Sequence, residues 1–366
     1  MMKKLRYLIF VIFWSCQGDA PDTFLIEGSI DGLNSRDLIY AKIKNGKPVY
    51  LDTINVSSNQ FVYKASELKQ EDFRFLVPIY DQKKFIKIFL DNSDIYLNGN
   101  IDSLKDVKII GSESHDLFAR LMSDYALIEK ESQVINLEYQ LAVLDNDSVG
   151  YIKLEEDLFA NESRKSSLFL DFANKHPDSD LSAWALYQIT AYDDYNTLKS
   201  SYDKLSEKVK LSLFSKNLEL VLNEMAKTAI GAQAPGFILP DINGENVTLE
   251  DFKGKFVLLN FWSPMCSYCR RENPKVAELY NSYREFEFEI LGINMEDEFD
   301  QEIWELVVKE DKLLFTQLLD TIGTADIFKV PNTPYNILLD KDGRIIAKDL
   351  HDERLELKLK EIFLKK

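Results

Sequence analysis

Two cysteines separated by two residues, Cys266 and Cys269, are the side chains of this sequence best suited to chemistry. A Cys-x-x-Cys pair can exchange a disulfide with another thiol pair, form a structural disulfide, or supply half of a zinc site. A zinc site needs about four ligands, and no second such pair exists; the three histidines lie far apart, at His115, His176 and His351. Thiol–disulfide exchange is the favoured chemistry, with a structural disulfide as the alternative. No metal and no cofactor is indicated.

The cysteine pair lies where a predicted strand gives way to a predicted helix. Residues 255–262 are a continuous apolar run, typical of a buried central strand, and residues 270–286 have amphipathic helical spacing. Cys266 therefore stands at a helix N-terminus, where unpaired N–H groups and the positive end of the helix dipole favour a thiolate. We expect Cys266 to attack a substrate disulfide and the more buried Cys269, one turn later, to resolve the mixed disulfide.

The rest of the chain divides into regions of different pattern. Residues 22–112 contain short β-branched and aromatic runs separated by turn signals, which is typical of an antiparallel sandwich or barrel. Residues 113–229 carry apolar residues at helical spacing and no catalytic motif. Residues 231–366 alternate strand-like and helix-like runs, which predicts an α/β domain. We therefore expect a multi-domain protein with its chemistry in the last third.

The first residues read as a targeting signal. Residues 1–6 are basic, residues 7–14 are apolar, and Ser15 precedes Cys16. The apolar run is shorter than the roughly 20 residues that cross a bilayer. The pattern resembles a bacterial lipoprotein signal, which implies removal of residues 1–15 and acylation of Cys16. A plain signal peptide or an uncleaved anchor is the alternative.

Acylation would attach the protein to a membrane of the cell envelope, facing the periplasm, an oxidising compartment. The formal net charge of −17 argues against nucleic acid as a partner, because an acidic surface repels phosphates. The length of 366 residues suggests two or three domains, and a hydrophobic content of 45% excludes a disordered chain.

The motifs of the last third resemble one known family. Residues 261–269 read Phe-Trp-Ser-Pro-Met-Cys-Ser-Tyr-Cys, residues 231–237 read Gly-Ala-Gln-Ala-Pro-Gly-Phe, and residues 330–340 contain Thr-Pro before an apolar strand. Together they resemble the TlpA/ResA branch of the thioredoxin family over residues 231–366. The resemblance implies a thioredoxin-like fold and a thiol:disulfide oxidoreductase that reduces disulfide-containing proteins. It also implies a membrane or envelope thiol reductant as electron donor.

The resemblance assigns further residues to the site. Pro334 would be the cis-proline, with Pro331 as the competing candidate. X–Pro is the bond at which cis costs little. Thr333, directly before it, would offer its backbone to an extended substrate. Trp262 would pack beside the site and contribute to substrate binding. Residues 22–112 loosely resemble a β-domain of unknown function that precedes thioredoxin-like domains in Bacteroidetes proteins.

One acidic residue is expected to move protons. Asn260 occupies the position at which thioredoxins carry a buried aspartate, and its amide cannot titrate. By resemblance, Glu272, three residues after Cys269, would exchange a proton with that thiol. The alternative is a solvated helix residue that pairs with a neighbouring cation: Arg270, Arg271 or Lys275.

Two other functions remain possible from the residues. Peroxiredoxins share the Ala-Pro-x-Phe opening, but Pro264 stands only two residues before Cys266, too close for their pattern, and their chemistry does not need this double cysteine. A non-enzymatic envelope-binding module with a vestigial thioredoxin unit is the other alternative. An intact cysteine pair together with Thr333-Pro334 argues against it.

Overall fold

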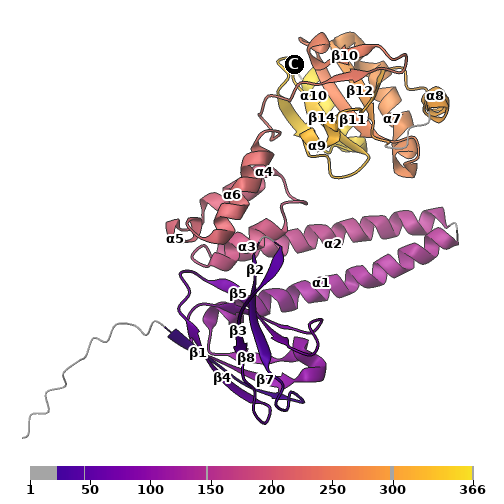
Figure 1. Ribbon diagram of the computed structural model, residues 1–366. Helices are drawn as coiled ribbons and strands as arrows, with labels where there is room; N and C mark the ends of the chain where they lie inside the picture. Colours follow the sequence, from indigo (N-terminus) through magenta and orange to yellow (C-terminus); the bar gives the residue numbers. More distant parts are fainter. Residues whose placement is uncertain (1–22, 45, 146, 297–300, 365–366) are drawn as a thin grey trace, which may run out of the picture. The chain divides into compact units, whose positions relative to one another are not determined.

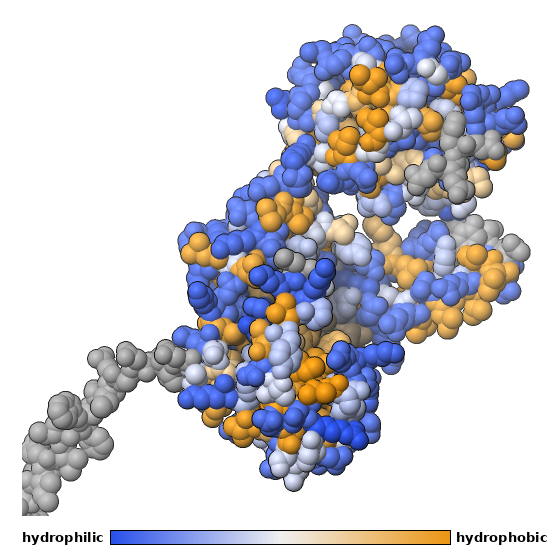
Figure 2. Space-filling view, viewed as in Figure 1, coloured by the Kyte–Doolittle hydropathy of each residue, from blue (hydrophilic) through white to orange (hydrophobic). Residues whose placement is uncertain are grey.

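The computed structural model describes residues 23–44, 46–145, 147–296 and 301–364 (Figure 1). The targeting signal and Cys16 lie outside these residues. The chain divides into two compact units, Met1–Leu127 and Ile128–Lys366. Over the described ranges, no helix combines the length and the apolar character needed to cross a membrane. Hydrophilic residues cover most of the face seen in Figure 2, with hydrophobic clusters between them.

The first unit contains two four-stranded sheets, with strand orders β4-β1-β7-β8 and β3-β2-β5-β6. Alternate residues of β1 are buried, and they include Ile26 and Ile30. These side chains share one apolar core with Leu38 of β2 and Leu76 of β5, so both sheets contribute to it. The bounds are β1 Thr23–Asp31, β2 Leu38–Lys44, β3 Lys47–Ile54, β4 Gln60–Ser66, β5 Asp72–Pro78, β6 Ile86–Leu90, β7 Ile95–Asn100, η1 Ile101–Asp106 and β8 Lys108–Ile110.

One strand pair departs from the antiparallel arrangement that the sequence predicts. Strands β1 and β7 pair in parallel, with Ile26 opposite Ile95. Parallel neighbours need a long crossover connection, and the strands of the second sheet provide it. The alternation of apolar residues along a strand reports which face is buried, but it carries no information about the direction of its neighbour.

Helices follow the sheets. Asp147 caps α2, and His176 ends it where the sequence shows a His-Pro break. The side chains of Ser132 and Asn161 join α1 to α2 through a 3.3 Å hydrogen bond. The bounds are α1 Glu113–Leu144, α2 Ser148–Lys175, α3 Asp180–Gln188, α4 Tyr195–Asp203, α5 Glu207–Lys210 and α6 Leu213–Ala226.

The last part of the second unit is a five-stranded mixed sheet of order β13-β12-β11-β14-β15. Its central strand β11 runs parallel to β12 and antiparallel to β14. The bounds are β9 Ile238–Pro240, β10 Asn246–Thr248, η2 Leu249–Phe252, β11 Phe256–Trp262, α7 Ser267–Tyr283, η3 Arg284–Phe286, β12 Phe288–Asn294, α8 Gln301–Glu310, β13 Thr316–Leu319, α9 Thr324–Phe328, β14 Tyr335–Leu339, β15 Ile345–Lys348 and α10 Asp352–Phe363.

Two apolar cores, one on each face, enclose this sheet. Leu258 and Trp262 belong to the core that also contains residues of α7, α8 and α10, whereas Val257, Leu259 and Phe261 belong to the other. A strand covered on both faces is apolar throughout, which is why residues 255–262 show no alternation. Packing on both faces therefore holds the end of β11, directly before the turn that carries Cys266, in one position.

Candidate active site

The junction between β11 and α7 positions the two cysteines. The chain leaves β11 at Trp262 and enters α7 at Ser267, with Cys266 as the N-cap residue. Cys266 and Cys269 form a disulfide, and their Cα atoms lie 5.2 Å apart. The structure therefore shows the oxidised form of a dithiol pair, and one helical turn holds both sulfurs.

The two sulfurs have different surroundings. Cys266 is half-buried, whereas Cys269 is only 1% exposed and packs in the core beside Trp262. The backbone N–H of Cys269 donates to the Cys266 sulfur over 3.1 Å. A donor at a helix N-terminus stabilises negative charge on that sulfur. The geometry therefore suits Cys266 to be the accessible nucleophile and Cys269 the protected partner.

The loop before β14 closes the other side of the site. The Thr333–Pro334 peptide bond is cis, and the Thr333 carbonyl oxygen lies 3.8 Å from the Cys266 sulfur. An open pocket of about 500 Å³ adjoins them. Its lining residues are Ser263, Met265, Cys266, Met295, Glu296, Asn332 and Thr333.

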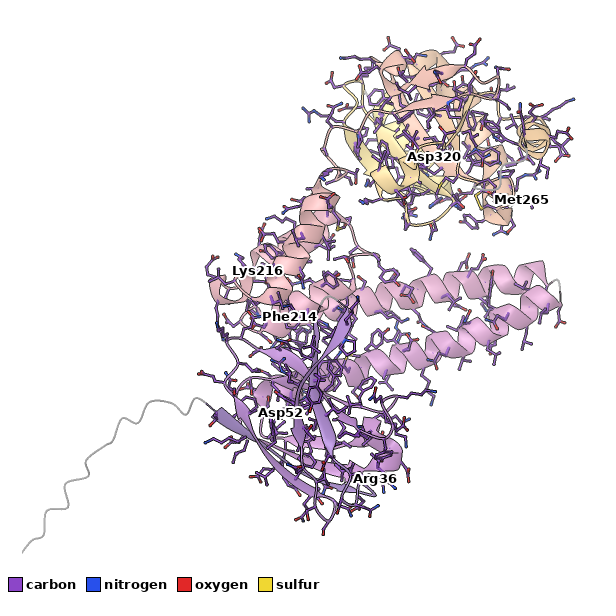
Figure 3. The ribbon with its side chains drawn as sticks, in the orientation of Figure 1. Arg36, Asp52, Phe214, Lys216, Met265 and Asp320 are labelled. Atoms are coloured by element: carbon purple, nitrogen blue, oxygen red, sulfur yellow. A yellow bond between two sulfur atoms is a disulfide. The ribbon has the colours of Figure 1, made fainter. Side chains whose placement is uncertain are left out.

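Trp262 does not fit the expected contribution to substrate binding. Its side chain is 1% exposed and belongs to the apolar core that contains Cys269. Inward-facing residues of a central strand are covered by the helices on that face. The most exposed apolar side chain next to the pair in sequence is Met265, at 69% exposure, labelled in Figure 3. Trp262 thus contributes to the buried core that contains Cys269 and is not open to a substrate.

Glu272 contacts a histidine that the sequence did not single out for the site. Glu272 Oε1 lies 2.8 Å from His351 Nδ1, and His351 Nε2 lies 2.7 Å from Asp349 Oδ1. The three neighbouring cations pair elsewhere: Arg270 binds Asp311 over 2.7 Å, Lys275 binds Glu356 over 2.9 Å, and Arg271 binds Glu155 over 3.7 Å. The alternative in which Glu272 is a solvated residue paired with a neighbouring cation is therefore wrong.

The two carboxylates change the ionisation of His351. Burial by itself would lower the pKa of the imidazole, but hydrogen bonds with Asp349 and Glu272 outweigh it and raise the pKa to about 9. The histidine is thus positively charged at neutral pH. The Glu272 and His351 side chains are only 11% and 16% exposed, so water screens this pair weakly.

Glu296 is a further acidic residue that sequence reasoning missed. Its carboxylate accepts a hydrogen bond from the Ser263 hydroxyl, and both residues line the pocket beside Cys266. Ser263 Oγ also accepts from the backbone N–H of Met265 over 3.0 Å. Glu296 follows β12 and lies 30 positions after Cys266 in the sequence, so no local motif marks it. His351 lies even farther along the chain.

Comparisons with known proteins match the two ends of the chain separately. Residues 24–118 match a domain of unknown function (DUF4369), and residues 230–348 match the AhpC/TSA family. Among solved structures, the thioredoxin domain of a thiol-disulfide oxidoreductase from Bacteroides vulgatus is 33% identical, with a TM-score of 0.35. That match covers 37% of this chain and 98% of the other.

Curated relatives match the part of the chain that holds the site. The thiol-disulfide oxidoreductase ResA of Bacillus thuringiensis subsp. konkukian is 38% identical over 141 residues, covering 38% of this chain and 79% of the relative. ResA of Geobacillus kaustophilus is 33% identical over 143 residues, covering 38% and 81%. With a cysteine pair at the N-terminus of α7 and a mixed five-stranded sheet behind it, the chain belongs to the ResA-like thiol-disulfide oxidoreductases of the thioredoxin fold.

Proposed function

We propose that this protein reduces disulfides of other proteins in the cell envelope through the dithiol of Cys266 and Cys269. The observation that carries the proposal is the arrangement of three features at one place. The disulfide stands at the N-terminus of α7, the cis bond before Pro334 lies opposite, and an open pocket exposes the Cys266 sulfur. An extended polypeptide can reach that sulfur from the pocket, whereas Cys269 is closed to it.

The reaction proceeds in two exchanges from the reduced enzyme. The Cys266 thiolate attacks one sulfur of the substrate disulfide, forms a mixed disulfide, and releases the other substrate sulfur as a thiolate that takes a proton. Cys269 then loses its proton and attacks the Cys266 sulfur. This step forms the disulfide seen in the structure and releases the second substrate thiol. Two electrons pass to the substrate, and a thiol reductant of the membrane or envelope restores the dithiol.

Two neighbouring residues have distinct parts in these exchanges. Thr333, which lines the pocket, presents backbone groups to the substrate chain beside Cys266. Glu272 lies one helical turn after Cys269 on α7, so its carboxylate is the group we assign to accept the Cys269 proton. Proton removal from a buried thiol is the step that most needs such a group, because burial disfavours the thiolate.

The remainder of the chain concerns the location of the protein and its division into domains. We infer that residues 1–15 form a lipoprotein signal of Bacteroidetes type and that acylated Cys16 attaches the protein to a membrane, facing the periplasm. The basic and apolar runs before Cys16 support this. We also divide the mature chain into a β-domain over residues 22–112, a helical region over 113–229 and the redox domain over 231–366. The apolar core shared by its two sheets supports a sandwich for the β-domain.

Reduction of insulin by dithiothreitol is the first test. The full-length Cys16→Ser protein should accelerate the reaction, and the added Cys266→Ser change should abolish the acceleration because no nucleophile remains. Cys16→Ser alone is the matched control, since it keeps the redox pair. If Cys266→Ser leaves the rate unchanged, the proposal is wrong. Turnover of hydrogen peroxide without insulin reduction would favour a peroxidase instead.

A further inference from the structure

We propose that His351 is a positioning residue of the redox site: it bridges Glu272 and Asp349 and thereby holds the Glu272 carboxylate one helical turn from Cys269. The proposal rests on the thiol chemistry of the preceding section. His351 itself touches neither sulfur in the described contacts; it acts through Glu272. Its two ring nitrogens face two carboxylates at 2.8 Å and 2.7 Å.

The hydrogen-bond pattern fixes the charge that the bridge requires. Neutral imidazole has one N–H donor and one acceptor, whereas imidazolium has two donors. Because both ring nitrogens face carboxylate oxygens, which only accept when ionised, only the imidazolium satisfies both contacts. His351 can therefore bridge the two carboxylates only while it is protonated, and loss of the proton breaks one of the two hydrogen bonds.

The bridge connects two elements that are remote in sequence. Glu272 belongs to α7, and His351 is the N-cap residue of α10. The loop before His351 is fastened to β14 by Asn336, which is 4% exposed. Its amide oxygen accepts from Leu350 N over 3.0 Å, and its backbone oxygen accepts from Asp349 N over 2.8 Å. Asn336 comes two residues after Pro334, so the bridge ties the cysteine helix to the cis-proline strand.

Several charged or titratable groups surround His351. Glu272 and Tyr268 face it from α7, with the Tyr268 and His351 rings edge to face at 6.3 Å. Asp349 faces it from the loop, and Asp352 follows it on α10. The Arg271 guanidinium lies over the Tyr268 ring, 4.9 Å from its centroid. Tyr268 lies between the two cysteines in sequence, so through this ring contact His351 packs against a residue of the Cys-x-x-Cys motif.

A pH dependence follows from the bridge, with a definite sign. The folded-state pKa of His351, raised to about 9, lies above the ordinary value of 6.5. The bridge therefore stabilises the folded site fully below about pH 6.5, and this stabilisation is lost as the pH rises through about 9. Above that pH, the neutral imidazole has one N–H and can donate to only one of Glu272 and Asp349, so it no longer bridges the two carboxylates.

The test compares His351→Gln with wild type, using His176→Gln, on the helical region, as the matched control. Glutamine keeps one hydrogen bond and loses the charge. We expect the rate of alkylation of the reduced thiols between pH 6 and 10, after division by the thiolate fraction measured from thiolate absorbance, to show a step near pH 9 in wild type and His176→Gln. The step should vanish in His351→Gln. Insulin reduction should fall roughly three- to tenfold in kcat, with KM unchanged, as expected for one lost hydrogen bond.

A second measurement needs no change at His351. The imidazole of His351 should titrate by NMR with a midpoint near 9 in the wild-type protein, and Glu272→Gln should move that midpoint toward 6.5. Two results would overturn the positioning role. One is an alkylation rate that depends on pH in His351→Gln as it does in wild type. The other is a His351 midpoint that Glu272→Gln leaves unchanged. An inactive wild-type protein would instead overturn the proposed function, so the two failures are distinguishable.

Discussion

Opposing influences act on the Cys266 sulfur. The N–H of Cys269 donates to it over 3.1 Å and favours the thiolate. Glu296, which shares the pocket with Cys266, adds a carboxylate that opposes a second negative charge. The sequence predicted the first influence, because a strand followed by an amphipathic helix indicates an N-terminus at Cys266. It could not predict the second, because Glu296 reaches the pocket only through the pairing of β11 with β12.

Glu296→Gln should make Cys266 more reactive. Removing a nearby negative charge favours the thiolate, so alkylation of reduced Cys266 at pH 7 should accelerate about two- to fivefold. Stopped-flow alkylation, with the modified residue identified by mass spectrometry, measures this. Glu278→Gln, an exposed change on α7, is the matched control. A slower reaction in Glu296→Gln would show that the carboxylate activates the thiol.

The elements around the site were predictable to different degrees. The apolar run of residues 255–262 corresponds to β11, Phe256–Trp262, because a strand buried on both faces has a distinctive composition. The amphipathic run of residues 270–286 corresponds to α7, which begins earlier, at Ser267, followed by η3. Neither the apolar pattern of residues 255–262 nor the amphipathic pattern of residues 270–286 indicates which distant segment packs on that element. The His351–Glu272 bridge depends on the turn between β15 and α10, which no periodic pattern describes.

Asn336→Ala should loosen that turn. The mutation removes two buried side-chain hydrogen bonds to Leu350 and leaves its backbone groups without those partners, which should cost about 2 kcal/mol of local stability. Hydrogen exchange at the amides of the turn between β15 and α10, which contains Leu350, measures the loss. Asn243→Ala, in an exposed turn, is the control and should have little effect. Equal exchange in both variants would mean that Asn336 does not fasten the turn.

At the scale of the whole molecule, the chain joins a redox domain to a β-sheet domain and helices that carry no recognised chemistry. Changes of sequence pattern near residues 112 and 230 predicted this organisation, because strands, helices and alternating elements have different periods. The parallel pairing of β1 with β7 was not predictable, since it joins segments separated by more than 60 residues. The net charge of −17 favours solubility and repels polyanions such as nucleic acid.

The most direct test of the central claim is to trap substrates with the full-length protein in intact cells. In Cys269→Ser, the resolving thiol is absent, so mixed disulfides should accumulate on Cys266 and should contain envelope proteins. Cys266→Ser should trap none, because Cys269 is only 1% exposed. Non-reducing gels followed by mass spectrometry identify the linked sulfur and its partners. An empty Cys269→Ser trap, or partners linked through Cys269 in Cys266→Ser, would contradict the account.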